Sequence, residues 1–337
     1  MSAPSAAQVT ADTTRSGTPA SWLRTLAPLL GLIAVILFFA FLSGAPGRYL
    51  SLTNLRVVLA QTVIVAIGAI GMTMIIISAG IDLSVGSIVA LCSVVTALAL
   101  RSAWNPLAAV ALGIAVGGLV GVMNGLAITA LRVVPFIATL GMLGVARGVA
   151  KWVASEQTVN APDTWVSNLA VTFPSQPWML VAPAVWLTVA LAVVMALVLR
   201  NTVFGRHIFA LGSNEAAARA CGIATNRLKI ITYGLAGLFF GLAGVMQMSR
   251  LRQGDPTVAV GLELDVIAAV VIGGASLNGG EGSLPGAMIG ALVMAFLRNG
   301  SQQLGWPNYI QEIMIGVIIV LAVAADRYRS SSGKSQS

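Results

Sequence analysis

The chain has 337 residues, of which 57% are hydrophobic and only 9% are charged. Soluble globular domains carry about 25% charged residues, so a soluble fold would lack the residues needed to cover its surface. Several apolar runs exceed the roughly 18 residues expected of a membrane-spanning helix. The composition therefore predicts an all-α polytopic membrane protein. The net charge of +8 is scattered among loops, as the positive-inside bias of membrane proteins explains, and argues for no nucleic-acid partner.

Metal and catalytic chemistry have little support in the sequence. Cys92 and Cys221 lie far apart, and the single histidine, His207, has no neighbouring cysteine or carboxylate. Neither a disulfide framework nor metal-ligand spacing is available. No HExxH or GxSxG pattern occurs. We therefore expect no metal site, no catalytic residue and no cofactor bound by this chain.

Residues 1–25 are predicted to form a disordered cytoplasmic tail, because Ser, Thr, Ala and Pro dominate their composition and no apolar periodicity occurs. The first apolar run, 26–42, has two interpretations: a retained span or the core of a signal peptide. Its length and the long tail before it favour a retained span. The membrane domain is predicted over 26–325, followed by a cytoplasmic C-terminal tail over 326–337.

About ten spans fit the apolar runs. The predicted spans are 26–43, 53–78, 86–101, 106–131, 136–153, 179–199, 229–249, 258–274, 285–299 and 309–325. At about 1.5 Å per residue, the shorter runs barely cross a hydrocarbon core of about 30 Å. The segments 136–153, 258–274 and 285–299 are therefore alternatively tilted, broken or re-entrant.

Basic residues predict the orientation. With ten spans, both tails, Arg132 and the loop 200–229 fall on one side, which the positive-inside rule makes cytoplasmic. The longest loop on the other side, 154–178, carries two acids and no basic residue. Arg250 and Arg252 depart from the rule on that side. An even number of spans with both ends in the cytoplasm follows.

Glycines at every fourth residue predict close helix packing. Such glycines are Gly113, Gly117, Gly121 and Gly125, with shorter repeats at Gly237 and Gly241 and at Gly286 and Gly290. Small-xxx-small faces let helix backbones approach closely in lipid. We interpret them as packing seams without chemistry.

A first polar interruption, SAGIDLSVGSIVAL, covers 78–91 and places Asp82 between two apolar runs. An acid at membrane depth costs about 2.5 kcal/mol or more. Ser84 is a candidate N-cap for the following helix, and Asp82 adds negative charge near its positive end. Asp82 either stabilises this helix start or lines a polar path. The residues predicted at or near a path are Asp82, Ser84, Asn124 and Asn278.

A second interruption covers 261–292, where Glu263 and Asp265 introduce a short apolar stretch and a glycine-rich turn follows. The segment contains no lysine, so a Walker A loop is absent, and no GxGxxG occurs. A tight turn between two membrane helices is predicted instead of a nucleotide site. Glycines predicted to form structural turns in the two interruptions are Gly80, Gly86, Gly273, Gly274, Gly279 and Gly280.

The loop 200–229 is a polar island with five basic residues and one acid, Glu215. Ser213 or Asn214 can cap a short helix from Glu215 to Arg219, and Gly222 can end it. Composition leaves two interpretations open: an ordinary connecting helix, or a small helix that inserts into a groove on another protein.

At these three motifs the sequence resembles the permease subunits of bacterial ATP-binding-cassette (ABC) sugar importers of the ribose, xylose and galactose type. That group includes the autoinducer-2 permeases and is related to the branched-chain amino acid permeases. GIDLSVGS at 80–87, the run from Ala210 to Gly274 and the GGEGS that follows carry the resemblance. It extends over about residues 50–325.

The resemblance implies a permease core that is a homodimer or heterodimer in the bacterial cytoplasmic (inner) membrane. It also implies cytosolic ATPase subunits, which bind the ATP, and a periplasmic or lipid-anchored sugar-binding protein. The helix 214–222 then looks like the coupling helix that transmits ATPase closure to the membrane helices. The residues expected to act in coupling are Ser213, Asn214, Glu215, Ala217, Arg219 and Gly222.

Two positions depart from the family pattern. Relatives usually carry Glu where Ala216 stands, so a capping box with Ser213 is unavailable, and they commonly carry Arg where this chain has Glu281. A stand-alone secondary transporter or channel is the alternative. It would need charged residues deep in several spans, and Asp82 is the one strong candidate that the sequence offers.

Overall fold

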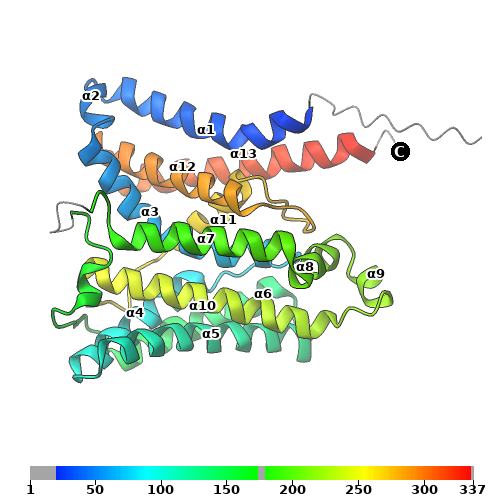
Figure 1. Ribbon diagram of the computed structural model, residues 1–337, viewed down its shortest axis with the longest axis horizontal. Coiled ribbons are helices and arrows are strands. Elements are labelled where there is room, and N and C mark those ends of the chain that lie inside the picture. Colours follow the sequence, from blue (N-terminus) through cyan, green and yellow to red (C-terminus); the bar gives the residue numbers. More distant parts are fainter. Residues whose placement is uncertain (1–19, 174–178, 335–337) are drawn as a thin grey trace, which may run out of the picture.

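A computed structural model describes residues 20–173 and 179–334. The long helices lie roughly side by side and give the molecule two ends (Figure 1). One end carries α8, α9 and the C-terminus, and is called the α9 end. The helices are α1 (Ala20–Leu42), α2 (Pro46–Tyr49), α3 (Leu52–Ile77), α4 (Val85–Arg101), α5 (Pro106–Ala130), α6 (Pro135–Val153), α7 (Pro183–Asn201), α8 (Val203–Ser213), α9 (Glu215–Ala220), α10 (Thr225–Leu251), α11 (Leu262–Ile272), α12 (Leu284–Gln303) and α13 (Asn308–Lys334).

The opposite end carries the few extended residues and is called the β end. There β1 (Val159–Asn160) pairs antiparallel with β2 (Gln253–Gly254), and a short 3-10 helix covers Trp165–Asn168. Arg252 forms an ion pair with Asp163 at 3.2 Å. One of the two basic residues that depart from the positive-inside pattern is thus paired with an acid of the 154–178 loop.

Each of the ten predicted spans overlaps one helix, although the helix in 258–274 is only Leu262–Ile272. Among the described residues, α3, α5, α6, α7 and α10 are long and apolar enough to cross a membrane by themselves. The first helix begins at Ala20, inside the predicted tail, and α13 continues to Lys334, inside the other predicted tail. Both helices run past their apolar residues because backbone hydrogen bonding does not require apolar side chains. Residues 1–19 and 335–337 lie outside the described residues.

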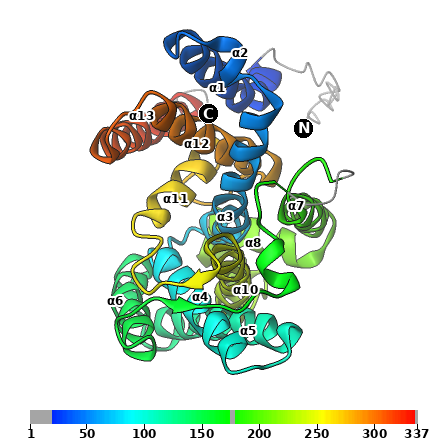
Figure 2. The same ribbon diagram turned by 90° about the vertical axis from the view of Figure 1, so that its left-hand side faces the viewer.

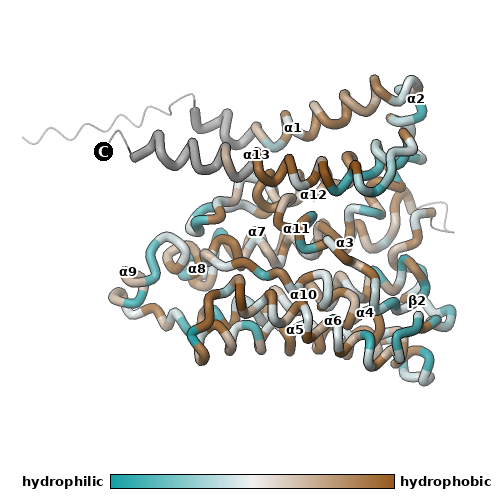
Figure 3. Tube along the Cα trace, turned by 180° about the vertical axis from the view of Figure 1, so that it is seen from behind, coloured by the Kyte–Doolittle hydropathy of each residue, from teal (hydrophilic) through white to brown (hydrophobic). Residues whose placement is uncertain are grey.

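Helix α3 lies at the centre of the bundle, where α10, α11, α12 and α7 pack against it (Figure 2). In its most apolar window, 94% of the residues are buried. The peripheral helices instead expose large apolar side chains, such as Leu119 in α5, Trp186 in α7 and Val320 in α13. Hydrophilic residues gather at the two ends (Figure 3). This distribution suits a bundle surrounded by lipid.

The predicted glycine seams are confirmed. A Cβ atom at Gly117 would collide with the carbonyl oxygen of Gly237 and would lie 2.6 Å from the Cα atom of Gly241. Gly121 likewise lies against Gly237, so α5 and α10 touch backbone to backbone. The repeat in α12 meets α11 in the same way, because a side chain at Gly290 would collide with the backbone of Ala269.

Two helices are interrupted near the middle of the bundle. The chain between α3 and α4 is irregular over 79–84, and the chain between β2 and α11 is irregular over 255–261. Helix α11, with 11 residues, covers only about 16 Å. A Cβ atom at Gly86 would collide with the carbonyl oxygen of Ala259, so the N-termini of α4 and α11 meet. The predicted span 258–274 is therefore broken, whereas 136–153 and 285–299 belong to continuous helices.

Candidate coupling helix and polar sites

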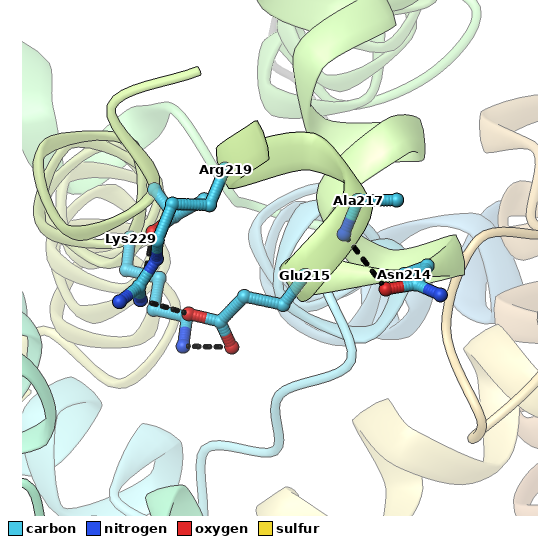
Figure 4. A network of polar contacts seen from close by, with 6 residues as sticks. Asn214, Glu215, Ala217, Arg219 and Lys229 are labelled. Carbon is cyan, nitrogen blue, oxygen red and sulfur yellow. Dashed lines mark hydrogen bonds and ion pairs between the residues drawn. The ribbon is translucent and has the colours of Figure 1, made fainter. Parts of the chain in front are cut away.

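Helix α9 is built as the sequence predicts. Of the two candidate caps, Asn214 fills the role: its Oδ1 atom accepts the backbone N–H of Ala217 at 3.0 Å (Figure 4). The backbone of Asn214 is extended, as expected for an N-cap. Gly222 has a φ of +84° and follows the last turn, where glycine permits the left-handed backbone that ends a helix.

Glu215 joins α9 to α10. One carboxylate oxygen accepts from Arg219 at 3.1 Å and the other from Lys229 of α10 at 2.8 Å (Figure 4). The hydrogen bond from Lys229, together with the charges of Lys229 and Arg219, holds the pKa of Glu215 below its ordinary value. The acid that stands one place before the family's usual position therefore binds a neighbouring helix.

The outer face of α9 is small and exposed. Ala216, Ala217 and Ala220 are exposed, while Ala218 is buried against the protein. Ser213 and Arg219 flank this face and are exposed as well. The helix thus presents methyl groups at its surface, and the ion pair between Glu215 and Lys229 ties it to α10.

The base of α9 rests on two other segments. A Cβ atom at Gly212, the penultimate residue of α8, would collide with the carbonyl oxygen of Ile77 and lie 2.6 Å from the backbone nitrogen of Gly280. Gly280 in turn donates its N–H to the Ile77 carbonyl at 2.8 Å. The ends of α3 and α8 and the glycine-rich turn before α12 therefore meet at one point.

That turn is the tight connection predicted between two membrane helices. Gly274, Gly279 and Gly280 have φ of +91°, +83° and +75°, respectively. Gly273 packs backbone to backbone against Gly286 at the start of α12. Asn278 is exposed in this turn, whereas the other residues predicted to lie near a path are fully buried.

Asp82, Ser84 and Asn124 form one fully buried network. Asp82 Oδ1 accepts from the backbone N–H of Ser84 at 2.8 Å and from its hydroxyl at 2.5 Å. Asn124 Nδ2 donates to Asp82 Oδ2 at 3.1 Å and to the Ser84 hydroxyl oxygen at 2.9 Å. Ser84 occupies the predicted N-cap position of α4, but its side chain makes no capping bond. Its backbone is helical, and its hydroxyl donates to Asp82.

The network holds the interruption between α3 and α4 in place. The neighbouring carbonyl of Ile81 accepts from Tyr233 of α10 and from Thr139 of α6, each at 3.3 Å. At Gly80 a Cβ atom would lie 2.5 Å from the Tyr233 hydroxyl. This geometry favours the interpretation that Asp82 stabilises a helix start. Its role in a path stays a prediction.

A polar cavity of about 270 Å³ lies among α3, α10, α11 and α12 and was not anticipated. Its polar lining consists of Gln61, Gln247, Arg250, Asp265, Arg298 and Gln302. Arg298 Nη2 donates to Asp265 Oδ2 at 2.5 Å, and Asp265 is 3% exposed. Asp82 is therefore not the one strong charged candidate within the bundle. The sequence held one signal for this cavity: Arg250 departs from the positive-inside pattern, and the structure places it in the cavity lining.

The irregular chain before α11 is held by Arg147 of α6, which sequence reasoning also missed. Its Nη1 atom donates to the carbonyl oxygens of Pro256 at 2.9 Å and Val258 at 2.6 Å. The sequence contained a signal for this second interruption, although it contained none for Arg147. The letters GIDLSV at 80–85 and GLELDV at 261–266 correspond position by position, and each leads into one of the two helices whose N-termini meet.

The family described as branched-chain amino acid transport system / permease component matches residues 54–323. The chain belongs to this permease family. It is 42% identical over 295 residues to the ribose import permease protein RbsC of Escherichia coli K12, covering 88% of this chain and 92% of that protein. It is 34% identical over 312 residues to the L-arabinose ABC transporter permease protein AraH of Azospirillum brasilense, covering 90% and 89%. It is 30% identical over 298 residues to the autoinducer 2 import system permease protein LsrC of Photorhabdus luminescens, covering 88% and 89%.

No solved structure matches the chain significantly. The relatives confirm the resemblance to permeases of bacterial ABC importers. The permease is accordingly a multi-pass membrane protein whose ATPase is a separate subunit.

Proposed function

We propose that the permease imports a monosaccharide or a similar small polar solute, and that α9 is the helix through which ATP hydrolysis drives it. The named transport of ribose, L-arabinose and autoinducer 2 by the relatives supports the solute class. The exposed alanine face of α9, anchored from behind by Glu215, is the observation that carries the coupling role.

The α9 end is proposed to face the cytoplasm. Basic residues are more numerous at this end. It carries Arg132, Arg200, Arg206, Arg219, Arg227, Lys229 and the basic residues at the end of α13, whereas the β end carries Arg48, Arg56, Arg101, Lys151 and Arg252. The positive-inside bias supports that orientation. A cytosolic ATPase would then meet α9, while a solute-binding protein, periplasmic or lipid-anchored, would dock at the β end. A second permease subunit, identical or homologous, completes the proposed importer.

Contacts of α9 suggest how its movement reaches the membrane helices. Glu215 is bound to Lys229, and Tyr233, one turn further along α10, is bonded to the carbonyl of Ile81. Displacement of α9 by the closing ATPase would therefore act on the interruption between α3 and α4. A second contact, Gly212 against Ile77, leads to the same place. These two contacts would give alternating access a physical route from α9 to the membrane helices.

The cavity around Asp265 and Arg298 is proposed as part of the solute path. Guanidinium groups donate hydrogen bonds, carboxylates accept them and glutamine amides do both, so the lining can exchange bonds with the hydroxyl groups of a sugar. Asp82, Ser84 and Asn124 are proposed to lie beside this path and to fix the helix start. For Asn278 we propose a place at the cytoplasmic exit, because it is exposed at the α9 end.

Substitution of Ala217 by Asp tests the coupling role, because a charged side chain would occupy the exposed alanine face. The Ala217→Asp variant should lose co-purification of the ATPase and lose solute uptake. Ala130→Asp is the matched control, since Ala130 is also exposed and ends α5 at the same end of the molecule. Retention of the ATPase by Ala217→Asp, or uptake that persists without any ATPase, would contradict the proposal.

A further inference from the structure

An apolar groove runs along α7, where this peripheral helix faces α3 and α12. It encloses about 310 Å³, and its lining is formed almost entirely by small or aliphatic side chains, among them Ala66, Val189, Ala192 and Leu292. Along α7 the lining extends from Val185 to Ala196, which is about 16 Å of helix. Half of a hydrocarbon core of about 30 Å is about 15 Å. The groove is therefore about as long as one leaflet is deep. It begins at Val185, the third residue of α7, and stops five residues before Asn201, the last residue of that helix.

The groove continues into a second cavity at the α9 end. This cavity encloses about 640 Å³ and shares Ala196 and Pro285 with the groove. Its polar lining includes Arg200, the penultimate residue of α7, and Arg206 in α8. The groove and the cavity thus adjoin and together form a channel, whose lining changes from apolar along α7 to cationic at the α9 end.

The two arginines lack acidic partners in the part of the chain that the structure describes: neither takes part in an ion pair. Gly282 and Ser283, which precede the N-terminus of α12, complete the cationic end of the cavity. A helix N-terminus carries partial positive charge, so it adds to the field of the guanidinium groups. Glu281, the acid of the adjoining turn, is not among the lining residues.

We propose that this channel binds one anionic phospholipid, with an acyl chain in the α7 groove and the phosphate between Arg200 and Arg206. Guanidinium groups bind phosphate oxygens through paired hydrogen bonds, and basic pockets between membrane helices accept anionic headgroups. The assignment of the headgroup to the cytoplasmic side rests on the proposed orientation, and the acyl chain would enter the groove at its Ala196 end. Because α8 leads directly into α9, the headgroup would lie beside the proposed coupling helix.

Lipid retention by the full-length permease tests this site without reference to transport. The protein is purified in mild detergent, supplied with phosphatidylglycerol or phosphatidylcholine, and examined by native mass spectrometry. Wild type should retain one phosphatidylglycerol in preference to phosphatidylcholine. The Arg200→Gln/Arg206→Gln variant should lower that preference by roughly 30-fold, as expected when two basic residues leave a membrane-surface site. Glycerol phosphate, which has the headgroup charge without acyl chains, should not displace the lipid.

The matched control is Arg132→Gln/Arg227→Gln, which removes the same charge from exposed positions outside the channel and should keep the wild-type preference. Ala196→Phe, which fills the junction of the two cavities, should reduce binding of both lipids. Equal loss in the control, an unchanged preference in Arg200→Gln/Arg206→Gln, or displacement by glycerol phosphate would overturn the proposal. So would loss of the ATPase from Arg200→Gln/Arg206→Gln while lipid preference stays intact, because the arginines would then serve a protein contact. Thermal unfolding without added lipid checks that each variant is folded.

Discussion

The contact between α5 and α10 predicts a large effect of adding one methyl group. In Gly117→Ala the new Cβ atom would lie 2.6 Å from the Cα atom of Gly241, whereas carbon atoms pack best at about 3.5–4.0 Å. The two helices would have to separate by about 1 Å. Overpacking costs up to about 3 kcal/mol, and the higher helix propensity of alanine returns about 1 kcal/mol. We expect a net loss of about 2 kcal/mol in the free energy of unfolding.

Unfolding of the purified permease in detergent, followed by thermal or denaturant titration, measures this loss. Gly148→Ala supplies the matched control, because a Cβ atom at Gly148 in α6 would meet nothing within 4 Å. That variant gains helix propensity without a clash and should unfold at the same denaturant concentration as wild type or a higher one. If the two variants were equally stable, the close backbone contact of α5 and α10 would be refuted.

Three further predictions concern the charged groups. The pKa of Glu215 lies below its ordinary value of 4.5, so the contribution of this carboxylate to stability is complete above pH 4.5 and is lost as the pH falls through the lowered pKa. Proteolysis of the 200–229 loop should therefore accelerate in acid. The Glu215→Gln variant should not show this pH dependence. Asp82→Ala should cost about 3 kcal/mol, because it leaves buried donors unpaired, as a denaturant titration would show; a cost near zero would contradict the buried network. The Arg298→Gln variant should lose about 3 kcal/mol of stability, because it leaves the Asp265 carboxylate unpaired. The double variant Asp265→Asn/Arg298→Gln should recover this stability without recovering solute uptake. Recovered uptake would exclude the pair from the solute path.

The helices were predictable because their apolar runs are long and are separated by polar breaks. Each of the ten predicted segments overlaps one helix, and the chain is non-helical around Asp82 and before Leu262. The short helix after Asn214 was predictable for a local reason. Its cap, its alanines and its terminal glycine follow one another directly in the sequence, so no distant contact was needed to identify it.

The polar cavity could not be predicted in the same way. Its charged and amide side chains come from four helices. Gln61 stands alone within an apolar run, whereas Arg298 and Gln302 belong to the polar stretch RNGSQQ at 298–303. Periodicity within one helix does not show which isolated polar residues will face one another. Packing of α10 against α11 and α12 decides that, and it depends on contacts distant in sequence.

Local capping rules also failed where a long-range contact competed with them. Ser84 precedes a helix, as an N-cap should, but Asp82 and Asn124 together bind its hydroxyl. Asn124 belongs to another helix, and its position opposite Ser84 becomes apparent only in the folded chain. The partner of Glu215 is likewise set by a contact with another helix, because Lys229 of α10, 14 residues away, binds its carboxylate.

The glycine joint at Gly212 has a mechanical consequence. Backbone atoms of α8, of the end of α3 and of the turn before α12 touch there without any intervening side chain. Flexible side chains can absorb a small displacement by changing rotamer, whereas backbone atoms in contact have no such freedom. The joint is therefore stiff in compression: a push on α8 toward Ile77 must displace α3 and the turn by nearly the same distance. Substitutions on the surface of α9 can therefore change which partner binds there, but they leave the backbone contact at Gly212, and the displacement that it transmits, unchanged.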